Sequence, residues 1–408
     1  MSIEIVKQNC TGCGACVNIC PKTCIKMIRD RDGFLYPTIG DNCIKCSVCE
    51  NVCPVLNPVV NKTGIKNAYA IYNCNESIRV ESSSGGFFSL VANYVIENGG
   101  AVFGAAFNKD FSVSHKCVEQ VEKLQDLRGS KYVQSDTGST FETVKTKLDS
   151  GQYVLYTGTP CQIEGLTKYL QKSYDKLITM DLVCHGVPSP GLWEDYVNLR
   201  ESEINAKTES VNFRLKEPSW VNYSIYFSFS NGKCYCESKD KDLFMQCFLK
   251  DLCLRPSCYS CQFKKNERSS DFTVADYWGV QKELPEFFDD KGISLVITNS
   301  QKAQDVLCAI SEGLICKKTD LSKAVNHNPA YYRSVFKPMY RDYFMRSKDE
   351  FGIEKSYNLT VKKIEKRKNR DKLFNNLLIR PVRQMKKRIK NLRLVIGCII
   401  NRSKKNDS

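Results

Sequence analysis

Two stretches near the amino terminus, residues 10–21 (CTGCGACVNICP) and residues 43–54 (CIKCSVCENVCP), share the spacing C-x2-C-x2-C-x3-C-P. In such a run, three closely spaced thiolates wrap one corner of a 4Fe-4S cubane, and the fourth cysteine, held before a proline, reaches the other cluster. The repeat therefore predicts two 4Fe-4S clusters with crossed ligands. The first cluster takes Cys10, Cys13, Cys16 and Cys53, and the second takes Cys43, Cys46, Cys49 and Cys20.

This spacing is the pattern of bacterial ferredoxins. The alternative is a zinc ribbon, in which four cysteines hold one tetrahedral ion. Zinc pairs its cysteines two by two and has no use for a fourth cysteine before proline in both repeats, so the ribbon is the weaker interpretation. Cys24 falls outside the pattern and is expected to be a packing thiol.

Composition indicates a globular protein of two or three domains, because 408 residues exceed what one hydrophobic core usually fills. The chain has 22 cysteines, and its start lacks the apolar segment of a secretory leader. We therefore expect reduced thiols and metal rather than disulfides, and a cytoplasmic location. No run of about eighteen apolar residues predicts a membrane span.

The net charge of +15 is concentrated in a carboxyl-terminal tail. Residues 362–408 hold 17 Lys and Arg against three acids, which is +14 of the total. No nucleic-acid partner is expected for the body of the protein, because its charge is nearly balanced. The tail has apolar Leu373, Phe374, Leu377 and Leu378, a basic run at 383–390 and an apolar run at 392–400. Such a segment could lie on the inner, anionic face of a membrane or be a flexible solubilising tail.

The middle of the chain alternates strand and helix patterns. Residues 152–157 and 177–183 are apolar strands, and each is followed by a helix start, Thr159-Pro160 and Ser189-Pro190. Successive units of this kind predict a parallel sheet, whose carboxyl-terminal edge is where open α/β sheets place ligands. Residues 210–236 alternate around Asn231-Gly232, which predicts an antiparallel hairpin. The fold class is therefore mixed α/β with a small ferredoxin-like module, and residues 292–299 with the segment near Leu314 are expected to form a last strand and helix.

A third metal site is expected at that edge. Cys258 and Cys261 form a C-x2-C knuckle, the spacing that lets two thiolates converge on one ion or cluster. Cys161 and Cys184 are the best further ligands because each stands at a strand end, and Cys253 is the reserve. Structural zinc is the alternative, since thiolate spacing alone does not separate it from a third 4Fe-4S cluster.

A serine and glycine run, Ser83, Ser84, Gly85 and Gly86, opens a helix at Phe87. Its backbone N–H groups, hydroxyls and helix dipole would suit a phosphate. An ordinary helix cap is the equal alternative, because no G-x-G-x-x-G fingerprint is present.

Several strings in combination resemble the beta subunit family of coenzyme F420 hydrogenase/dehydrogenase over roughly residues 1 to 300. These strings are residues 83–87 (SSGGF), 128–132 (RGSKY), 157–162 (TGTPCQ), 184–186 (CHG), 255–261 (RPSCYSC) and 270–279, which ends in DYWG. The resemblance implies an iron-sulfur flavoprotein in which electrons pass between clusters, a bound FAD and a hydride-accepting or hydride-donating substrate.

The resemblance also implies roles for single residues. Ser83, Ser84, Gly85 and Gly86 would hold the flavin diphosphate, Lys131 would lie near the isoalloxazine as the catalytic cation, and Gly158 and Thr159 would line the same pocket. A cation there stabilises the negatively charged reduced flavin. Without the resemblance, Lys131 is expected to be a solvated surface charge.

The expected function is that of a cytoplasmic iron-sulfur and FAD-dependent oxidoreductase acting on coenzyme F420 or another small molecule. The alternative is an electron-transfer subunit whose substrate chemistry belongs to a partner. A redox partner protein or a small electron carrier is expected in either case. The predicted domains are 1–60 (ferredoxin-like), 66–150 (flavin-binding), 151–345 (α/β with the third metal site) and 355–408 (basic tail).

Overall fold

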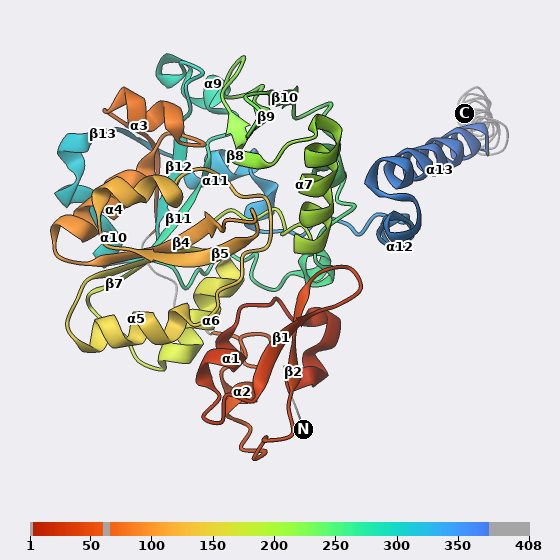
Figure 1. Ribbon diagram of the computed structural model, residues 1–408. Helices are drawn as coiled ribbons and strands as arrows, with labels where there is room; N and C mark the ends of the chain where they lie inside the picture. Colours follow the sequence, from red (N-terminus) through yellow and green to blue (C-terminus); the bar gives the residue numbers. More distant parts are fainter. Residues whose placement is uncertain (1–2, 60–65, 375–408) are drawn as a thin grey trace, which may run out of the picture. The chain divides into compact units, whose positions relative to one another are not determined.

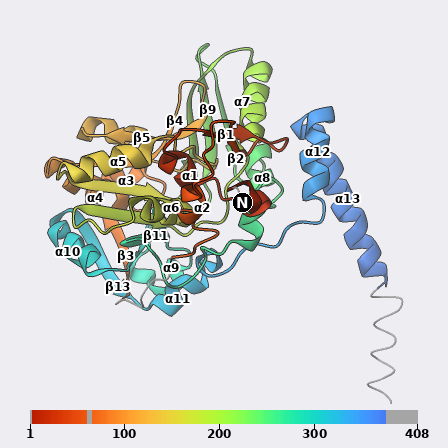
Figure 2. The same ribbon diagram turned by 90° about the horizontal axis from the view of Figure 1, so that it is seen from below.

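A computed structural model describes residues 3–59 and 66–374 (Figures 1 and 2). Contacts divide the chain into two units, Met1–Arg341 and Asp342–Ser408. The described part of the second unit consists of α12 (Arg341–Phe351) and α13 (Ile353–Phe374). The predicted segments of the tail beyond residue 374 lie outside the described residues. No helix among the described residues is long and apolar enough to cross a membrane.

The two cysteine repeats lie in a small module at the start of the first unit. Each repeat contains one short helix, and a two-stranded antiparallel hairpin joins the repeats. The elements are η1 (Ile3–Asn9), α1 (Ala15–Ile19), β1 (Ile25–Arg29), β2 (Leu35–Ile39) and α2 (Val48–Asn51). The module is the red part of Figure 1, and it lies beside α6.

The rest of the first unit is built on a mixed sheet, which in the described residues has eight strands in the order β13-β3-β12-β11-β7-β6-β4-β5. Strands β4, β6, β7 and β11 run parallel to one another, and the outer neighbours pair antiparallel. The strands are β3 (Asn67–Asn73), β4 (Ala101–Phe107), β5 (Val113–Val118), β6 (Val154–Gly158), β7 (Leu177–Leu182), β11 (Phe272–Asp276), β12 (Ser294–Thr298) and β13 (Leu314–Thr319).

Alternation along the strands divides the core into two layers. Leu155 of β6 packs with one apolar cluster, which contains α4 (Phe87–Glu97) and α10 (Gln301–Ala309). Its neighbours Val154 and Tyr156 point the other way and pack against α5 (Thr140–Asp149) and α6 (Pro160–Leu170). Successive strand residues face opposite sides of a sheet, so both faces of this sheet are covered.

The predicted antiparallel hairpin is confirmed as part of a second sheet. Strand β9 (Ser224–Phe229) pairs with both β8 (Thr208–Leu215) and β10 (Cys234–Ser238), and Gly232 takes a positive φ at the turn. Aromatic rings pack this sheet against α7 (Pro190–Ile204) and α8 (Leu243–Leu249) around Trp193. The remaining elements are α3 (Glu76–Glu81), α9 (Val280–Glu283), α11 (Leu321–Asn326) and the short turns η2 (Val121–Asp126), η3 (Pro256–Ser260), η4 (Pro285–Phe287), η5 (Ser311–Gly313) and η6 (Pro329–Tyr331).

The mixed α/β class and the strand and helix starts are confirmed. Thr159 caps α6 and Pro160 is its first residue, while Ser189 caps α7 through a bond from the Leu192 N–H to its hydroxyl. The expected helix near Leu314 is wrong. Residues 314–319 form the edge strand β13, and the helix α10 precedes it. Only Leu314 in β13 is buried, and the sequence LICKKT does not alternate between apolar and polar residues. It therefore lacks the pattern that identifies a strand.

A buried cation helps to fix the cysteine module to the sheet domain. Arg255, which is fully buried, donates to the backbone carbonyls of Cys10 (2.7 Å) and Leu35 (2.8 Å) and to the side-chain oxygen of Gln134 (2.9 Å). Gln134 in turn donates to the carbonyl of Thr11. The first repeat and the sheet domain therefore share one hydrogen-bonded layer.

We expect Arg255→Met to lower the free energy of unfolding by about 3 kcal/mol or more, because each buried acceptor left without a donor costs about 1–3 kcal/mol. Thermal melting and limited proteolysis of the intact protein would measure this loss of stability, and proteolytic cleavage within residues 3–59 should become faster. The exposed Arg333→Met is the control and should change little. Equal melting temperatures for the two variants would contradict the proposed role of Arg255.

Candidate metal centres

The two cysteine repeats have the same backbone conformation at equivalent positions. Gly12 and Gly14 in the first repeat and Lys45 and Ser47 in the second all take a positive φ, between 56° and 81°. Residues with a side chain rarely adopt this backbone conformation, so glycine is the expected residue. The repeat seen in the sequence is therefore also a repeat of the loop geometry.

The difference between the repeats lies in what surrounds them. A Cβ at Gly12 would lie 2.4 Å from the Gln134 side chain, and one at Gly14 would lie 2.2 Å from Thr137 Oγ1. The first repeat thus packs tightly against the sheet domain and needs glycine at both positions. The second repeat carries Lys45 and Ser47 there instead, and its Cys46 is exposed.

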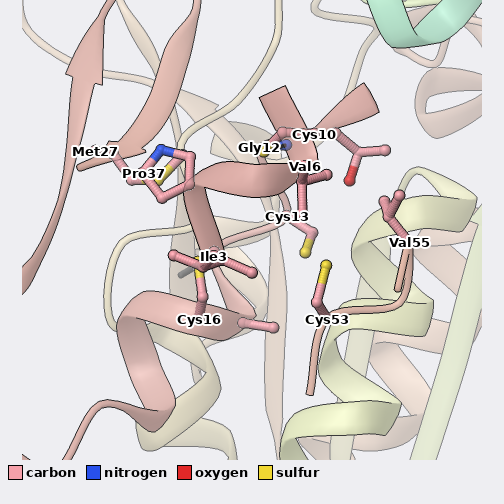
Figure 3. Close-up of a pocket in the computed structure, with 13 residues that line it drawn as sticks. Ile3, Val6, Cys10, Gly12, Cys13, Cys16, Met27, Pro37, Cys53 and Val55 are labelled. Carbon is pink, nitrogen blue, oxygen red and sulfur yellow. Dashed lines mark hydrogen bonds between the residues drawn. The ribbon is translucent and has the colours of Figure 1, made fainter. Parts of the chain in front are cut away.

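All four cysteines predicted for the first cluster surround one cavity. Cys10, Cys13, Cys16 and Cys53 line it, together with apolar side chains such as Ile3 and Val55. The sulfur atoms of Cys13 and Cys53 point toward one another across it (Figure 3). This is the crossed set that the spacing predicts, with three cysteines from the first repeat and one from the second.

The thiols around this cavity are costly to ionise. Burial raises the pKa of Cys13 to about 12 and the pKa of Cys16 well above its usual value, and the neighbouring thiols add to both effects. A buried thiolate needs a compensating positive charge. A cubane core with iron supplies such a charge, so the donor set fits a 4Fe-4S cluster.

The cysteines of the second repeat lie nearer the surface. Cys20, Cys43 and Cys49 are partly exposed. Cys24, expected to be a packing thiol, lies with its Sγ 3.4 Å from Cys20 Sγ, and the proximity of Cys20 and then of Cys43 raises its pKa to about 11. The structure thus places a fifth thiol beside the predicted ligands of the second cluster.

The four cysteines predicted for a third site also come together. The pKa of Cys161 is raised first by burial and then by the neighbouring Cys261, Cys184 and Cys258. Burial raises the pKa of Cys184 to about 12 and that of Cys258 to about 11. The donor set fits a cationic metal centre for the same reason as at the first repeat.

These four thiols are positioned by the ends of two strands and by a contact between two loops. Strands β6 and β7 are parallel with Gly158 opposite Asp181, so Cys161 and Cys184 follow them at the same edge of the sheet. The loop after Cys184 meets the knuckle, since a Cβ at Gly186 would lie 3.3 Å from Cys258 Cβ. Cys253, the reserve ligand, is buried elsewhere, beside Arg341 and Asp251.

The first and third sites are neighbours. Helix α6 carries Cys161 at its start, and one turn later a Cβ at Gly165 would lie 2.9 Å from Cys13 Sγ. Residues four apart lie on one helix face, about 6 Å along its axis. A second cavity is lined by Cys261 and by Val6, Thr11 and Val55, which also line the first cavity.

Within the described part of the chain, no three Cys, His, Asp or Glu side chains gather closely enough to hold a single metal ion. The thiols of the first site instead surround a cavity. Every cysteine in the same residues is a free thiol.

The serine and glycine run is only partly available to a ligand. Ser83 Oγ accepts from the backbone N–H of Ser130 (2.7 Å), and Ser84 Oγ donates to the carbonyl of Ile293 (2.9 Å). The Gly85 N–H donates to Ser294 Oγ (3.0 Å). What is left for a phosphate is the amino-terminal end of α4, where Gly86 has a positive φ and no side chain caps the helix.

Lys131 is brought next to this run through Ser130, but its ammonium donates to the carbonyls of Asp126 and Arg128 in its own loop. Burial lowers its pKa to about 7, and the residue as a whole is half-buried. Thr159 lies with the third cysteine site instead, with its Oγ1 3.1 Å from Cys161 Sγ. Gly158, which precedes it, packs beside Gln162 and His115.

A ferredoxin-like module docked at the ligand-binding edge of an α/β sheet defines an iron-sulfur protein of the oxidoreductase class. Comparison with protein families agrees. Residues 9–57 match the 4Fe-4S dicluster domain, and residues 151–323 match the C terminus of the beta subunit of coenzyme F420 hydrogenase/dehydrogenase. The resemblance recognised in the sequence is confirmed.

Comparison with solved structures finds a similar chain in the F420-reducing NiFe hydrogenase complex from Methanosarcina barkeri, in a structure prepared with xenon. The two chains share 15% sequence identity, and the alignment covers 76% of this chain and 96% of that chain with a TM-score of 0.43. No curated protein matches this chain.

Gly165→Ala tests the contact between α6 and the first repeat. Alanine would favour the helix by about 1 kcal/mol, but its Cβ would meet Cys13 Cβ and Sγ at 2.9 Å. We expect the steric effect to be larger than the gain in helix propensity. The anaerobically purified variant should then melt at a lower temperature than the parent and contain less iron. The matched control is Lys168→Ala, later on the same helix. A Gly165→Ala protein that is more stable than the parent with full iron would contradict this packing.

Proposed function

We propose that the protein is an iron-sulfur oxidoreductase component that conducts single electrons through three 4Fe-4S clusters. The second repeat, with exposed Cys46, would exchange electrons with a redox partner protein or a small carrier. The buried first repeat would pass them to the third cluster. The adjacency of Cys13 to α6, one turn from Cys161, is the observation that carries this proposal.

The proposed ligands follow from the cysteines that each site gathers. The first cluster would take Cys10, Cys13, Cys16 and Cys53, and the second would take Cys43, Cys46, Cys49 and Cys20. The third would take Cys161, Cys184, Cys258 and Cys261. A structural zinc ion is the alternative at the third site, and the cluster is favoured because that site adjoins the dicluster domain.

A finer proposal adds FAD at the carboxyl-terminal edge of the sheet. When bound, FAD would exchange single electrons with the clusters and a hydride with a substrate. The amino-terminal end of α4 at Gly86 would receive the diphosphate, with Ser83, Ser84 and Gly85 shaping the loop. Lys131 would place its ammonium near the ring, while Gly158 and Thr159 would lie between the flavin and the third cluster. The substrate would be coenzyme F420 or another small hydride carrier, as the family's name suggests.

The second candidate is an electron-transfer subunit without substrate chemistry of its own. It is favoured by the loop at residues 83–86, where the Ser83 and Ser84 hydroxyls and the Gly85 N–H already have protein partners. A partner chain would then carry the substrate site. A cytoplasmic location, with the basic tail resting on the inner membrane surface, accompanies either candidate as a prediction.

Removing the knuckle tests the third cluster. We expect about twelve irons per chain in the anaerobically purified parent and about eight in the Cys258→Ser, Cys261→Ser double variant, because a cubane rarely survives on two thiolates. The matched control is Cys234→Ser, Cys236→Ser, which removes two exposed thiols. Iron and zinc analysis would decide. Unchanged iron in the first variant would remove the third cluster, and one zinc per chain in the parent would favour the structural ion.

Lys131→Met tests the flavin. We expect bound FAD in the parent and a lower flavin midpoint potential in the variant at pH 6, where Lys131 is protonated because its pKa is about 7. Above pH 7 the parent's midpoint should fall more steeply than the variant's, since reduction then draws a proton onto the lysine. The exposed Lys123→Met is the control. A parent protein that binds no flavin, even after incubation with FAD, would favour the electron-transfer subunit.

A further inference from the structure

Lys264 is a buried cation beside the third cysteine site. Its side chain is 8% exposed, and Nζ donates to the backbone carbonyl of His185 at 2.9 Å. This partner is neutral. A buried ammonium is costly unless an opposite charge lies close to it.

The neighbouring basic residues have their counter-ions. Lys265 Nζ lies 2.7 Å from Glu164 Oε1, and Arg268 lies 3.5 Å from Asp181 Oδ2. In the described residues, no carboxylate is found in an ion pair with Lys264. Two of the three cations after the knuckle are therefore balanced by the protein, and the third is not.

The position of Lys264 shows where the balancing charge lies. It follows Cys261 by three residues, and the carbonyl that it contacts belongs to the residue after Cys184. Its charge opposes the effect of burial on the pKa of Cys184, Cys258 and Cys261. The four cysteines of the third site thus lie beside a buried cation that has no carboxylate partner among the described residues.

The first site has a buried cation of its own, because Arg255 donates to the carbonyl of Cys10. The effect expected of Lys264 is therefore an effect on the potential of the third site alone. Reduction adds one negative charge to a cluster. A fixed cation in a poorly solvated site stabilises that added charge, so it raises the reduction potential.

We propose that Lys264 is a positioning residue that raises the reduction potential of the third cluster and so favours electron transfer to it from the first cluster. In this step the reduced first cluster loses one electron and the oxidised third cluster gains it, and no bond or proton moves. The inference rests on the third cluster of the proposed function.

Neutral variants of the full chain test it. Lys264→Gln removes the charge and keeps a donor for the His185 carbonyl. Lys264→Met keeps an unbranched apolar side chain and removes both the charge and the donor. We expect each to retain the parent's iron and to shift the electron distribution between the first and third clusters at least tenfold toward the first. For a one-electron couple this is about 59 mV. Anaerobic redox titration followed by electron paramagnetic resonance would measure it.

Two further variants control for structural effects. Lys264→Arg should restore the parental potential, because it returns the charge. Lys302→Met removes a lysine that also donates only to backbone carbonyls, those of Tyr174 and Leu177 at the opposite end of β7, and it should leave all potentials unchanged.

The outcomes distinguish the role proposed for Lys264 from the existence of the third cluster. About eight irons in the parent would remove the third cluster itself. With about twelve irons in the parent, an unchanged third potential in Lys264→Gln would overturn the role of Lys264. Loss of the third cluster in both neutral variants would also overturn it, because the residue would then retain the cluster rather than tune it.

Discussion

The close packing of the first cysteine repeat against the sheet domain is the constraint on which the rest of the structure depends. Gly12 and Gly14 have no room for a side chain, and Gly165 faces Cys13 from α6. Arg255 completes the contact by donating to the carbonyl of Cys10 from inside the sheet domain. This packing places the first cysteine repeat within one helix turn of Cys161, the start of the third cysteine site.

Charge balance explains why the thiols can be so deeply buried. Cys13, Cys16, Cys161 and Cys184 all have raised pKa values because burial opposes their ionisation. A metal centre reverses this cost by supplying positive charge. The sites differ in the protein charges around them, since Lys264 and Arg268 act on Cys261 at the third site. A protein can thus build similar donor sets and still give each one a different affinity for electrons.

The sheet edge concentrates the remaining chemistry. Parallel strands β6 and β7 bring Cys161 and Cys184 to one end, and the loop after β3 brings the serine and glycine run to the same end. This arrangement follows from the architecture, because open α/β sheets collect their loops at the carboxyl ends of the strands. Whether that edge also holds a flavin depends on the free end of α4 more than on the Ser83 and Ser84 hydroxyls, which already have partners.

The sequence by itself determined the features that rest on local spacing. The two cysteine repeats, the helix starts at Thr159-Pro160 and Ser189-Pro190, and the parallel order of the strands between them could all be read from neighbouring residues. Four cysteines of the third site could also be chosen, because strand ends and a knuckle are local patterns. Tertiary structure alone decided the rest. The edge strand β13 forms through pairing with β3, Arg255 reaches a carbonyl 245 positions away, and Lys264 donates to the carbonyl of His185, 79 positions away. These contacts join residues far apart in the chain, and their energies depend on burial, which spacing along a sequence does not specify.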